Sequence, residues 1–129
     1  MPKTGDRFDS YTYQNWGEYS PKRDSESRTE MLSEAYLAIP QKYAKKYDIY
    51  MSNKKGANTD YDAYDQNGNY ICVLKAQGNV GKGHVYAKQF SGSGNLKALE
   101  KWIKMYNISD SDTIEIKFLS SSELKLTKV

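Results

Sequence analysis

The 129-residue sequence has few of the residues that build a disulfide framework, a metal site or a membrane span. It contains one cysteine, Cys72, and one histidine, His84, so an internal disulfide is excluded and a zinc site of nitrogen and sulfur ligands is not expected. No stretch approaches the roughly 18 continuous apolar residues that cross a bilayer, and the N-terminal MPKTGDRFDS lacks the apolar core of a secretory signal. We therefore expect a soluble, cytoplasmic protein that needs no metal or other cofactor.

The sequence is rich in aromatic residues, and its charge is unevenly distributed. Only 38% of the residues are hydrophobic, yet 13% are aromatic, so a core can form if the tyrosines and tryptophans join it. The net charge is only +3, but residues 35–105 carry 11 lysines against 5 acidic residues. A local basic excess of this kind is typical of a surface that binds polyanions, although a solvated lysine-rich face would have the same composition.

A short apolar run followed by a proline predicts a corner between a strand and a helix. Ala35–Ile39 has the composition of a strand, and Pro40 suits the first turn of a helix because it needs no N–H partner there. The helix should run to about Tyr47. Tyr43, Ala44 and Tyr47 then fall at helical spacing and face the core, which leaves the lysines of this segment to water or to a ligand.

The remaining elements follow from turn signals and from hydrophobic spacing. Asp65-Gln66-Asn67-Gly68 is a strong hairpin turn, since Asn-Gly accepts positive φ easily. The pattern predicts a hairpin at 61–77, a strand at 84–90, a helix capped by Asn95 that ends near 106, and final strands at 113–118 and 124–129. Six or seven short strands with two short helices indicate a mainly β, α+β domain of the closed or partly closed barrel type.

No motif in the sequence predicts catalysis. The glycine-rich GNVGKG at 78–83 differs from a phosphate-binding P-loop, because its glycines are too close together and a strand, not a helix, follows it. Two other segments carry donors and acceptors suited to phosphates and base edges: the charged loop at 20–28 and the loop KAQGNVGKGHVY at 75–86. The sequence therefore favours a binding protein over an enzyme.

Several segments resemble a known DNA-binding domain, and they occur in the same order. LAIPQKYAKKYDI resembles the strand, Ile-Pro and helix corner of the B3 domain of plant transcription factors. NGNYICVLKAQ, HVYAKQF and NLKALEKWIKMYNISDSDTIEIKFL are similar to segments that follow that corner. SEAYLAIP is also similar to the GEAYIPIP corner of B3-like specificity domains in type II restriction endonucleases of the BfiI and NgoFVII kind. The likeness covers residues 20–129, which implies one domain preceded by an N-terminal extension at 1–19.

The resemblance implies a seven-stranded open pseudobarrel that grips the major groove of double-stranded DNA with two loop arms and has no catalytic activity of its own. A nuclease domain or partner chain would have to supply cleavage. The implied N-arm residues are Ser20, Lys22, Arg23, Ser25, Ser27 and Arg28, and the implied C-arm residues are Lys75, Gln77, Asn79, Lys82, His84 and Tyr86. Arginine, glutamine, asparagine and histidine would contact base edges, while serine and lysine would contact phosphates.

Two other classes of function fit the same composition. A protein-interaction module, for example an inhibitor from a mobile element, would use the 12 tyrosines as a contact patch. A binder of RNA or of single strands would stack bases on surface tyrosines. The first would show little salt-dependent binding of DNA, and the second would be competed by single strands.

Overall fold

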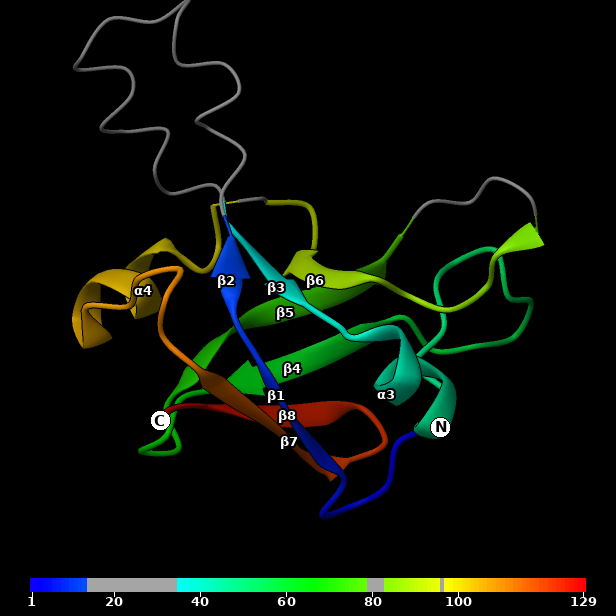
Figure 1. Cartoon of the computed structure of the whole chain (residues 1–129), viewed down its shortest axis with the longest axis horizontal. Coiled ribbons are helices and arrows are strands. Elements are labelled where there is room, and N and C mark those ends of the chain that lie inside the picture. The colour runs from blue at the N-terminus through cyan, green and yellow to red at the C-terminus, as the bar shows by residue number, and fades with distance from the viewer. Residues whose placement is uncertain (14–34, 79–82, 96) are drawn as a thin grey trace, which may run out of the picture.

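The computed structural model describes residues 1–13, 35–78, 83–95 and 97–129, which form a mainly β structure with two short helices (Figure 1). The strands are β1 (Arg7–Ser10), β2 (Thr12–Tyr13), β3 (Tyr36–Ala38), β4 (Asp60–Tyr64), β5 (Tyr70–Gln77), β6 (Gln89–Gly92), β7 (Ile114–Ser120) and β8 (Glu123–Lys128), and the helices are α3 (Gln41–Lys46) and α4 (Glu100–Tyr106). In this part of the chain no helix is long and apolar enough to span a membrane. The α+β class is as predicted, with eight described strands in place of the expected seven.

All of these strands belong to one sheet, in the order β1-β7-β8-β4-β5-β6-β3-β2. Neighbouring strands are antiparallel except β4 and β8, which run parallel. β1 and β2 lie at opposite ends of this order, yet only Tyr11 separates them in the sequence. The sheet therefore curves until its two edges almost meet, which gives the nearly closed barrel seen in Figure 1.

Residues 7–13, which the sequence placed in an extension before the domain, pair into the sheet of the domain itself. β1 is antiparallel to β7, and β2 is antiparallel to β3. The backbone N–H of Ala38 donates to the carbonyl oxygen of Tyr11 at 3.0 Å, and the buried Ser10 hydroxyl donates to the carbonyl oxygen of Ala38. These bonds tie the N-terminal segment to the strand that precedes α3.

Large aromatic side chains fill the middle of the barrel. Tyr61 on β4, Phe90 on β6 and Phe118 on β7 are almost completely buried. The ring centroid of Tyr61 lies 5.5 Å from that of Phe90 and 5.7 Å from that of Phe118, both in edge-to-face arrangements. Such contacts stabilise beyond the burial of apolar area, and here they join strands from different parts of the sheet.

The predicted corner between strand and helix is confirmed. β3 ends two residues before Pro40, and α3 begins directly after this proline, whose φ is −58°. Ala44 is fully buried, while Tyr43 and Tyr47 are partly buried against the core. The apolar face of α3 thus covers one end of the barrel, and its lysines face outward, as helical spacing requires.

The strand predicted at 84–90 is shorter than expected, because β6 begins only at Gln89. Residues before it bond instead to the segment that follows α3. The N–H of Met51 donates to the carbonyl oxygen of Val85, and the N–H of Ala87 donates to that of Ile49, both at 2.9 Å. The backbone groups of residues 85–87 therefore pair with the segment after α3, and they are not available to extend β6 toward its N-terminus.

The second helix also begins later than predicted, at Glu100. The Oδ1 atom of Asn95 accepts a hydrogen bond from the N–H of Lys97 at 3.0 Å, so Asn95 stabilises a turn before the helix. Gly92 on β6 lies against this turn. A Cβ atom added at Gly92 would be 1.9 Å from the carbonyl oxygen of Asn95 and 2.6 Å from the Cβ of Ala98, so only glycine fits there.

Replacement of Gly92 by alanine is expected to lower the free energy of unfolding by about 2–3 kcal/mol, because the backbone of β6 and the turn that begins at Asn95 must move apart. Gly94 in the same turn has φ +71° but open space around it, so Gly94→Ala should cost only about 1 kcal/mol of backbone strain. Urea unfolding of both variants measures the difference. Equal losses in the two variants would contradict the close approach at Gly92.

Asp65 holds the turn between β4 and β5, and its side chain is 3% exposed. Its Oδ1 atom accepts hydrogen bonds from the N–H groups of Asn67 at 2.8 Å and Asn69 at 2.9 Å. Burial alone would raise the pKa of the carboxyl group, but these backbone donors outweigh it, so the pKa of Asp65 lies below its ordinary value of 3.8. The ionised side chain is therefore part of the folded turn.

Because its pKa is lower in the folded than in the unfolded chain, Asp65 stabilises the fold above about pH 4, and this contribution is lost as the pH falls through the folded-state pKa. Asp65→Asn is expected to lower the free energy of unfolding at about pH 7 by roughly the worth of one charge-assisted hydrogen bond. The difference between the variant and the original chain should shrink as the pH falls towards about 2, because the carboxyl group then becomes protonated in the folded chain. Urea titrations at the two pH values test this, and a difference independent of pH would contradict it.

Candidate nucleic-acid interface

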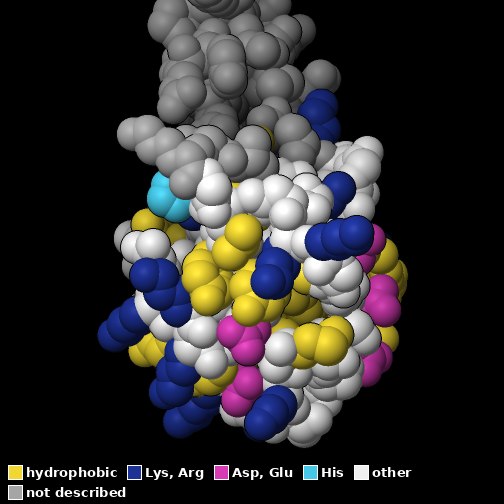
Figure 2. Space-filling model, turned by 90° about the vertical axis from the view of Figure 1, so that its right-hand side faces the viewer, with side chains coloured by type: hydrophobic (Ala, Val, Ile, Leu, Met, Phe, Trp, Pro, Cys, Tyr) yellow, Lys and Arg dark blue, Asp and Glu magenta, His cyan; other side chains and the backbone are white. Residues whose placement is uncertain are grey.

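One end of the barrel gathers lysines from segments that are far apart in the sequence. α3, the 49–58 loop and residues 83–88 lie together at this end, on the right of Figure 1. β5 ends beside them. We call the following set the basic end: Lys42, Lys45, Lys46, Lys54, Lys55, Lys75 and Lys88. Figure 2 shows this side of the molecule, with Lys and Arg side chains around a group of hydrophobic ones and the histidine at the border.

The lysines of the basic end lack acidic partners. Within the described residues, none of them forms an ion pair with a carboxylate. Elsewhere on the surface such pairs do occur: Arg7 lies 3.2 Å from Glu115, and Lys104 pairs with Glu100 on α4. The sequence also has no aspartate or glutamate between residues 65 and 100. The positive potential at the basic end is therefore left largely uncompensated.

Two acids border this region: Asp60, which lies opposite Lys75 across β4 and β5, and Asp48, just after α3, which is already engaged. Its Oδ2 atom lies 3.6 Å from the N-terminal amine of Met1, and its Oδ1 atom accepts a hydrogen bond from the Tyr50 hydroxyl at 3.2 Å. Burial and the neighbouring Asp48 charge raise the pKa of the Tyr50 hydroxyl. Asp48 thus pairs with the N-terminal amine and with Tyr50, and it forms no ion pair with a lysine of the basic end.

The two loops of the basic end are held together by stacking and by hydrogen bonds. Tyr50 and Tyr86 form an isolated antiparallel bridge, and their rings stack with centroids 5.2 Å apart. The side-chain amide of Asn53 donates to the carbonyl oxygen of His84. The Nζ atom of Lys54 lies 5.4 Å from the centroid of the Tyr50 ring, a cation–π contact. These contacts hold the cations of both loops on one face.

Four of the predicted C-arm residues lie in the described part of the chain. Lys75 and Gln77 are partly exposed near the end of β5, opposite Ser91 and Gln89 of β6. His84 is exposed, and Tyr86 is half-buried beside Tyr50. The other predicted residues lie outside the described ranges: Asn79 and Lys82 of the C-arm and Ser20, Lys22, Arg23, Ser25, Ser27 and Arg28 of the N-arm.

A hollow of about 310 Å³ lies between α3 and residues 83–88. Its lining includes the side chains of Gln41, Lys45, His84 and Lys88. Amide, imidazole and ammonium groups therefore come together at a surface depression, where they can offer hydrogen-bond donors and acceptors to an incoming ligand. α3 thus adds residues to the predicted C-arm that the sequence analysis did not include.

Sequence reasoning also missed the contribution of the 49–58 loop. SNKKGAN at 52–58 has the composition of an ordinary turn, and nothing local indicates that it lies against residues 83–88. The one signal that was present is charge, since Lys54 and Lys55 stand in a stretch without acids that runs from Asp48 to Asp60. Charge alone did not show which other lysines they join.

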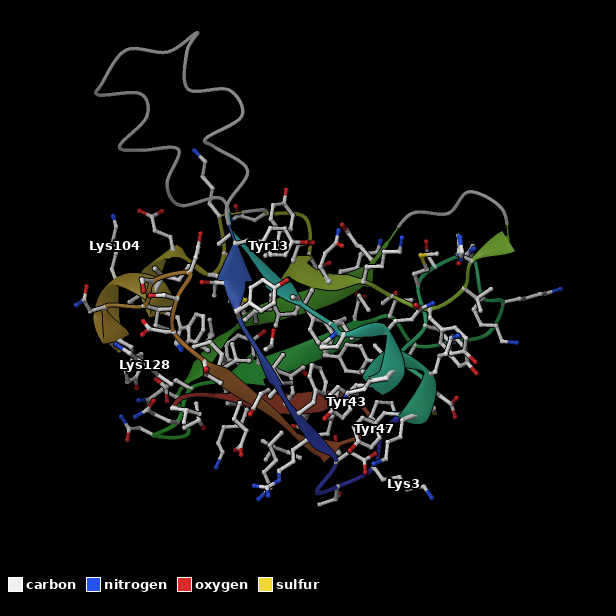
Figure 3. All side chains as sticks on the ribbon, in the orientation of Figure 1. Lys3, Tyr13, Tyr43, Tyr47, Lys104 and Lys128 are labelled. Atoms are coloured by element: carbon white, nitrogen blue, oxygen red, sulfur yellow. The ribbon has the colours of Figure 1, made fainter. Side chains whose placement is uncertain are left out.

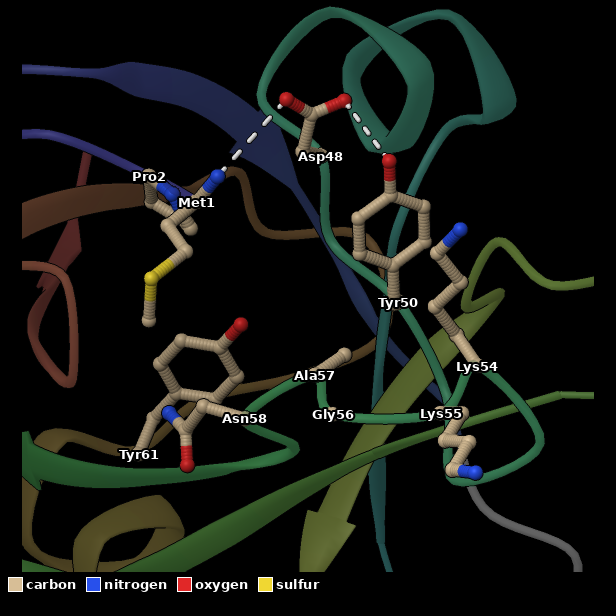
Figure 4. Close-up of a pocket in the computed structure, with 10 residues that line it drawn as sticks. All are labelled: Met1, Pro2, Asp48, Tyr50, Lys54, Lys55, Gly56, Ala57, Asn58 and Tyr61. Atoms are coloured by element: carbon tan, nitrogen blue, oxygen red, sulfur yellow. Dashed lines mark hydrogen bonds and ion pairs between the residues drawn. The ribbon is translucent and has the colours of Figure 1, made fainter.

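A small pocket of about 200 Å³ opens beside Lys54 and Lys55 (Figure 4). Its lining residues are Met1, Pro2, Asp48, Tyr50, Lys54, Lys55, Gly56, Ala57, Asn58 and Tyr61. The Tyr61 side chain is only 1% exposed, and its hydroxyl points into the pocket. Burial raises the pKa of Tyr61 to about 12, so this hydroxyl remains protonated at neutral pH and can donate a hydrogen bond.

The cysteine of the chain lies on β5 and is partly buried. Burial raises the pKa of the Cys72 thiol to about 11, so at neutral pH it stays protonated and is a poor nucleophile. Among the described residues, no three histidine, cysteine, aspartate or glutamate side chains lie close enough together to hold a metal ion.

Comparison with known proteins assigns no family to the chain. No protein-family model matches the chain, and no curated protein matches it. A solved structure of a hypothetical protein from Arabidopsis thaliana is similar over 100% of this chain and 95% of its own, with 15% sequence identity and a TM-score of 0.48. What the protein binds must therefore be argued from its own residues.

Proposed function

We propose that this protein is a B3-like domain that binds double-stranded DNA through its basic end. It would read a sequence in the major groove with two loop arms, and a nuclease domain or partner chain would supply any cleavage. The observation that carries the proposal is the set of lysines on α3 and the two loops that have no carboxylate partner within the described residues. Such lysines suit a phosphate backbone, because each contact releases a condensed counterion.

Polar groups beside these lysines supply what base reading requires. Gln41 and His84 are exposed and line one hollow with Lys45 and Lys88. Gln77 is partly exposed, and its carbonyl oxygen accepts a hydrogen bond from the N–H of Lys88. Glutamine can pair with an adenine edge through two hydrogen bonds, and histidine can donate to or accept from a base. Phosphate contacts fix the register of a protein on DNA, whereas contacts of this second kind distinguish sequences.

The sheet order supports the use of two arms. The predicted N-arm lies in the link between β2 and β3, and the predicted C-arm lies in the link between β5 and β6. β5, β6, β3 and β2 are consecutive in the sheet. The β2–β3 link joins β3 at Tyr36, opposite Ser91 near the end of β6, and the β5–β6 link joins β6 at Gln89, opposite Ala38, so the two links leave opposite ends of neighbouring strands. This arrangement, together with the nearly closed sheet, fits a pseudobarrel that holds one duplex between two arms.

The test of this proposal is selection from a randomised double-stranded DNA pool at about physiological salt, followed by sequencing of the retained molecules. We expect a short enriched motif whose binding resists competition by single strands. Retention of DNA without an enriched motif would mean that the basic end binds polyanions without reading a sequence. Competition by single strands would favour the single-strand binder, and no retention at all would favour the protein-interaction module.

The double variant Lys45→Ala with Lys88→Ala should weaken binding of all duplexes alike and lower the slope of log affinity against log salt by about 2, because each phosphate contact contributes about 0.9. The matched control is Lys101→Ala with Lys104→Ala on α4, which lies across the barrel from α3 (Figures 1 and 3). It removes the same charge from another face and should leave the slope almost unchanged. Equal effects of the two pairs in a salt titration would mean that net charge, not the basic end, determines binding.

A further inference from the structure

The pocket in Figure 4 contains a polar group that the described residues leave without a partner. The ring of Tyr61 packs edge-to-face against the rings of Phe90 and Phe118. Its hydroxyl points into the pocket. None of the described residues accepts from or donates to this hydroxyl. The ring is buried, whereas the hydroxyl group opens into the pocket, so it can donate a hydrogen bond to an occupant that carries an acceptor.

A second polar group beside Tyr61 is held in a defined orientation. The Asn58 amide donates to the carbonyl oxygen of Asp60 at 2.6 Å, and its Oδ1 atom accepts from the N–H of Asp60 at 3.3 Å. The side chain therefore cannot rotate freely, and it retains one amide hydrogen for another partner. Asp48 is engaged with Met1 and Tyr50, so the polar groups in the pocket are mainly neutral donors.

The mouth of the pocket is positively charged. Lys54 and Lys55 are exposed and, within the described part of the chain, have no carboxylate partner. Lys54 lies over the ring of Tyr50, which also lines the pocket. A ligand that matches these walls has a neutral part with hydrogen-bond acceptors on the inside and an anionic group at the rim.

The size of the pocket limits that neutral part to one small ring system. Its volume of about 200 Å³ is below the roughly 300–1,000 Å³ of ordinary ligand sites. It is also several times the roughly 30 Å³ that one water molecule occupies. Gly56 and Ala57 add little bulk to its walls, and Tyr50 supplies an aromatic surface.

We infer that this pocket binds a single nucleobase, with the attached phosphate held by Lys54 and Lys55. The Tyr61 hydroxyl donates to a ring carbonyl or ring nitrogen of the base, and the Asn58 amide provides a second hydrogen bond. A base with a phosphate can come from a free nucleotide or from a nucleotide extruded from duplex DNA. The second source rests on the function proposed above, whereas the first does not.

The two sources differ in what binding costs. An extruded base must first be unpaired and unstacked, and this cost is smallest at a mismatch. A protein that captures an extruded base should therefore prefer a mismatched duplex to a fully paired one. A pocket that takes free nucleotides should bind mononucleotides directly and show no such preference.

The experiment compares the original chain with Tyr61→Phe and with Tyr64→Phe. Tyr64 is the matched control, since it also lies on β4 but its hydroxyl contacts Glu123 and it does not line the pocket. Binding is measured for a paired duplex, for the same duplex with one mismatch placed at each position in turn, and for the four deoxynucleoside monophosphates. We expect the best mismatched duplex to bind about fivefold to tenfold more tightly than the paired one, and Tyr61→Phe alone to abolish that gain.

Each result decides between the inference and its alternatives. Mononucleotide binding that depends on Tyr61, without binding of any duplex, would support the pocket and refute the proposed DNA function. A mismatch preference that survives Tyr61→Phe would overturn the inference, because the preference would then arise elsewhere. Paired DNA bound with neither a mismatch preference nor nucleotide binding would overturn it as well, while leaving the DNA-binding function intact.

Discussion

The fold depends on the short connection between β1 and β2, which is the single residue Tyr11. β1 pairs with β7 at one edge of the sheet, and β2 pairs with β3 at the other. Strands in a sheet lie about 4.8 Å apart, so the edges of a flat sheet of this many strands would be separated by about 30 Å. One residue spans only about 3.5 Å. The sheet must therefore curl, and that curvature encloses the aromatic core around Tyr61.

The same closure keeps the charged side chains outside the barrel. The interior is filled by apolar and aromatic side chains, so lysines have room only outside the barrel wall or beyond its ends. α3 covers one end with Ala44 inside and its lysines outside, and the contact between Tyr50 and Tyr86 brings two further loops beside it. The basic end is thus a consequence of how the barrel is covered, and its cations stay in water, where they need no buried partner.

Local signals were enough to predict several elements and failed where pairing is long-range. The corner at Pro40, the hairpin turned by Asp65 and the last two strands were predicted because proline, Asn-Gly and period-two alternation act over a few residues. β1 was not predicted, because Ser10, one of its two inward residues, is polar and hides the alternation. The predicted strand at 84–90 starts late for a related reason, since residues 85–87 bond to a segment that lies far away in the sequence.

The lysines of the basic end and the Tyr61 pocket would contribute to binding in different ways. Lysine–phosphate contacts release counterions, so their share of the affinity falls steeply as salt rises. The Tyr61 hydroxyl is neutral, because its pKa of about 12 keeps it protonated, and a hydrogen bond from it releases no counterion. The lysines would attract any polyanion within about 10 Å, but they would not fix its register. One base seated on Tyr61 would fix that register, so general attraction and local selection can be adjusted by separate residues.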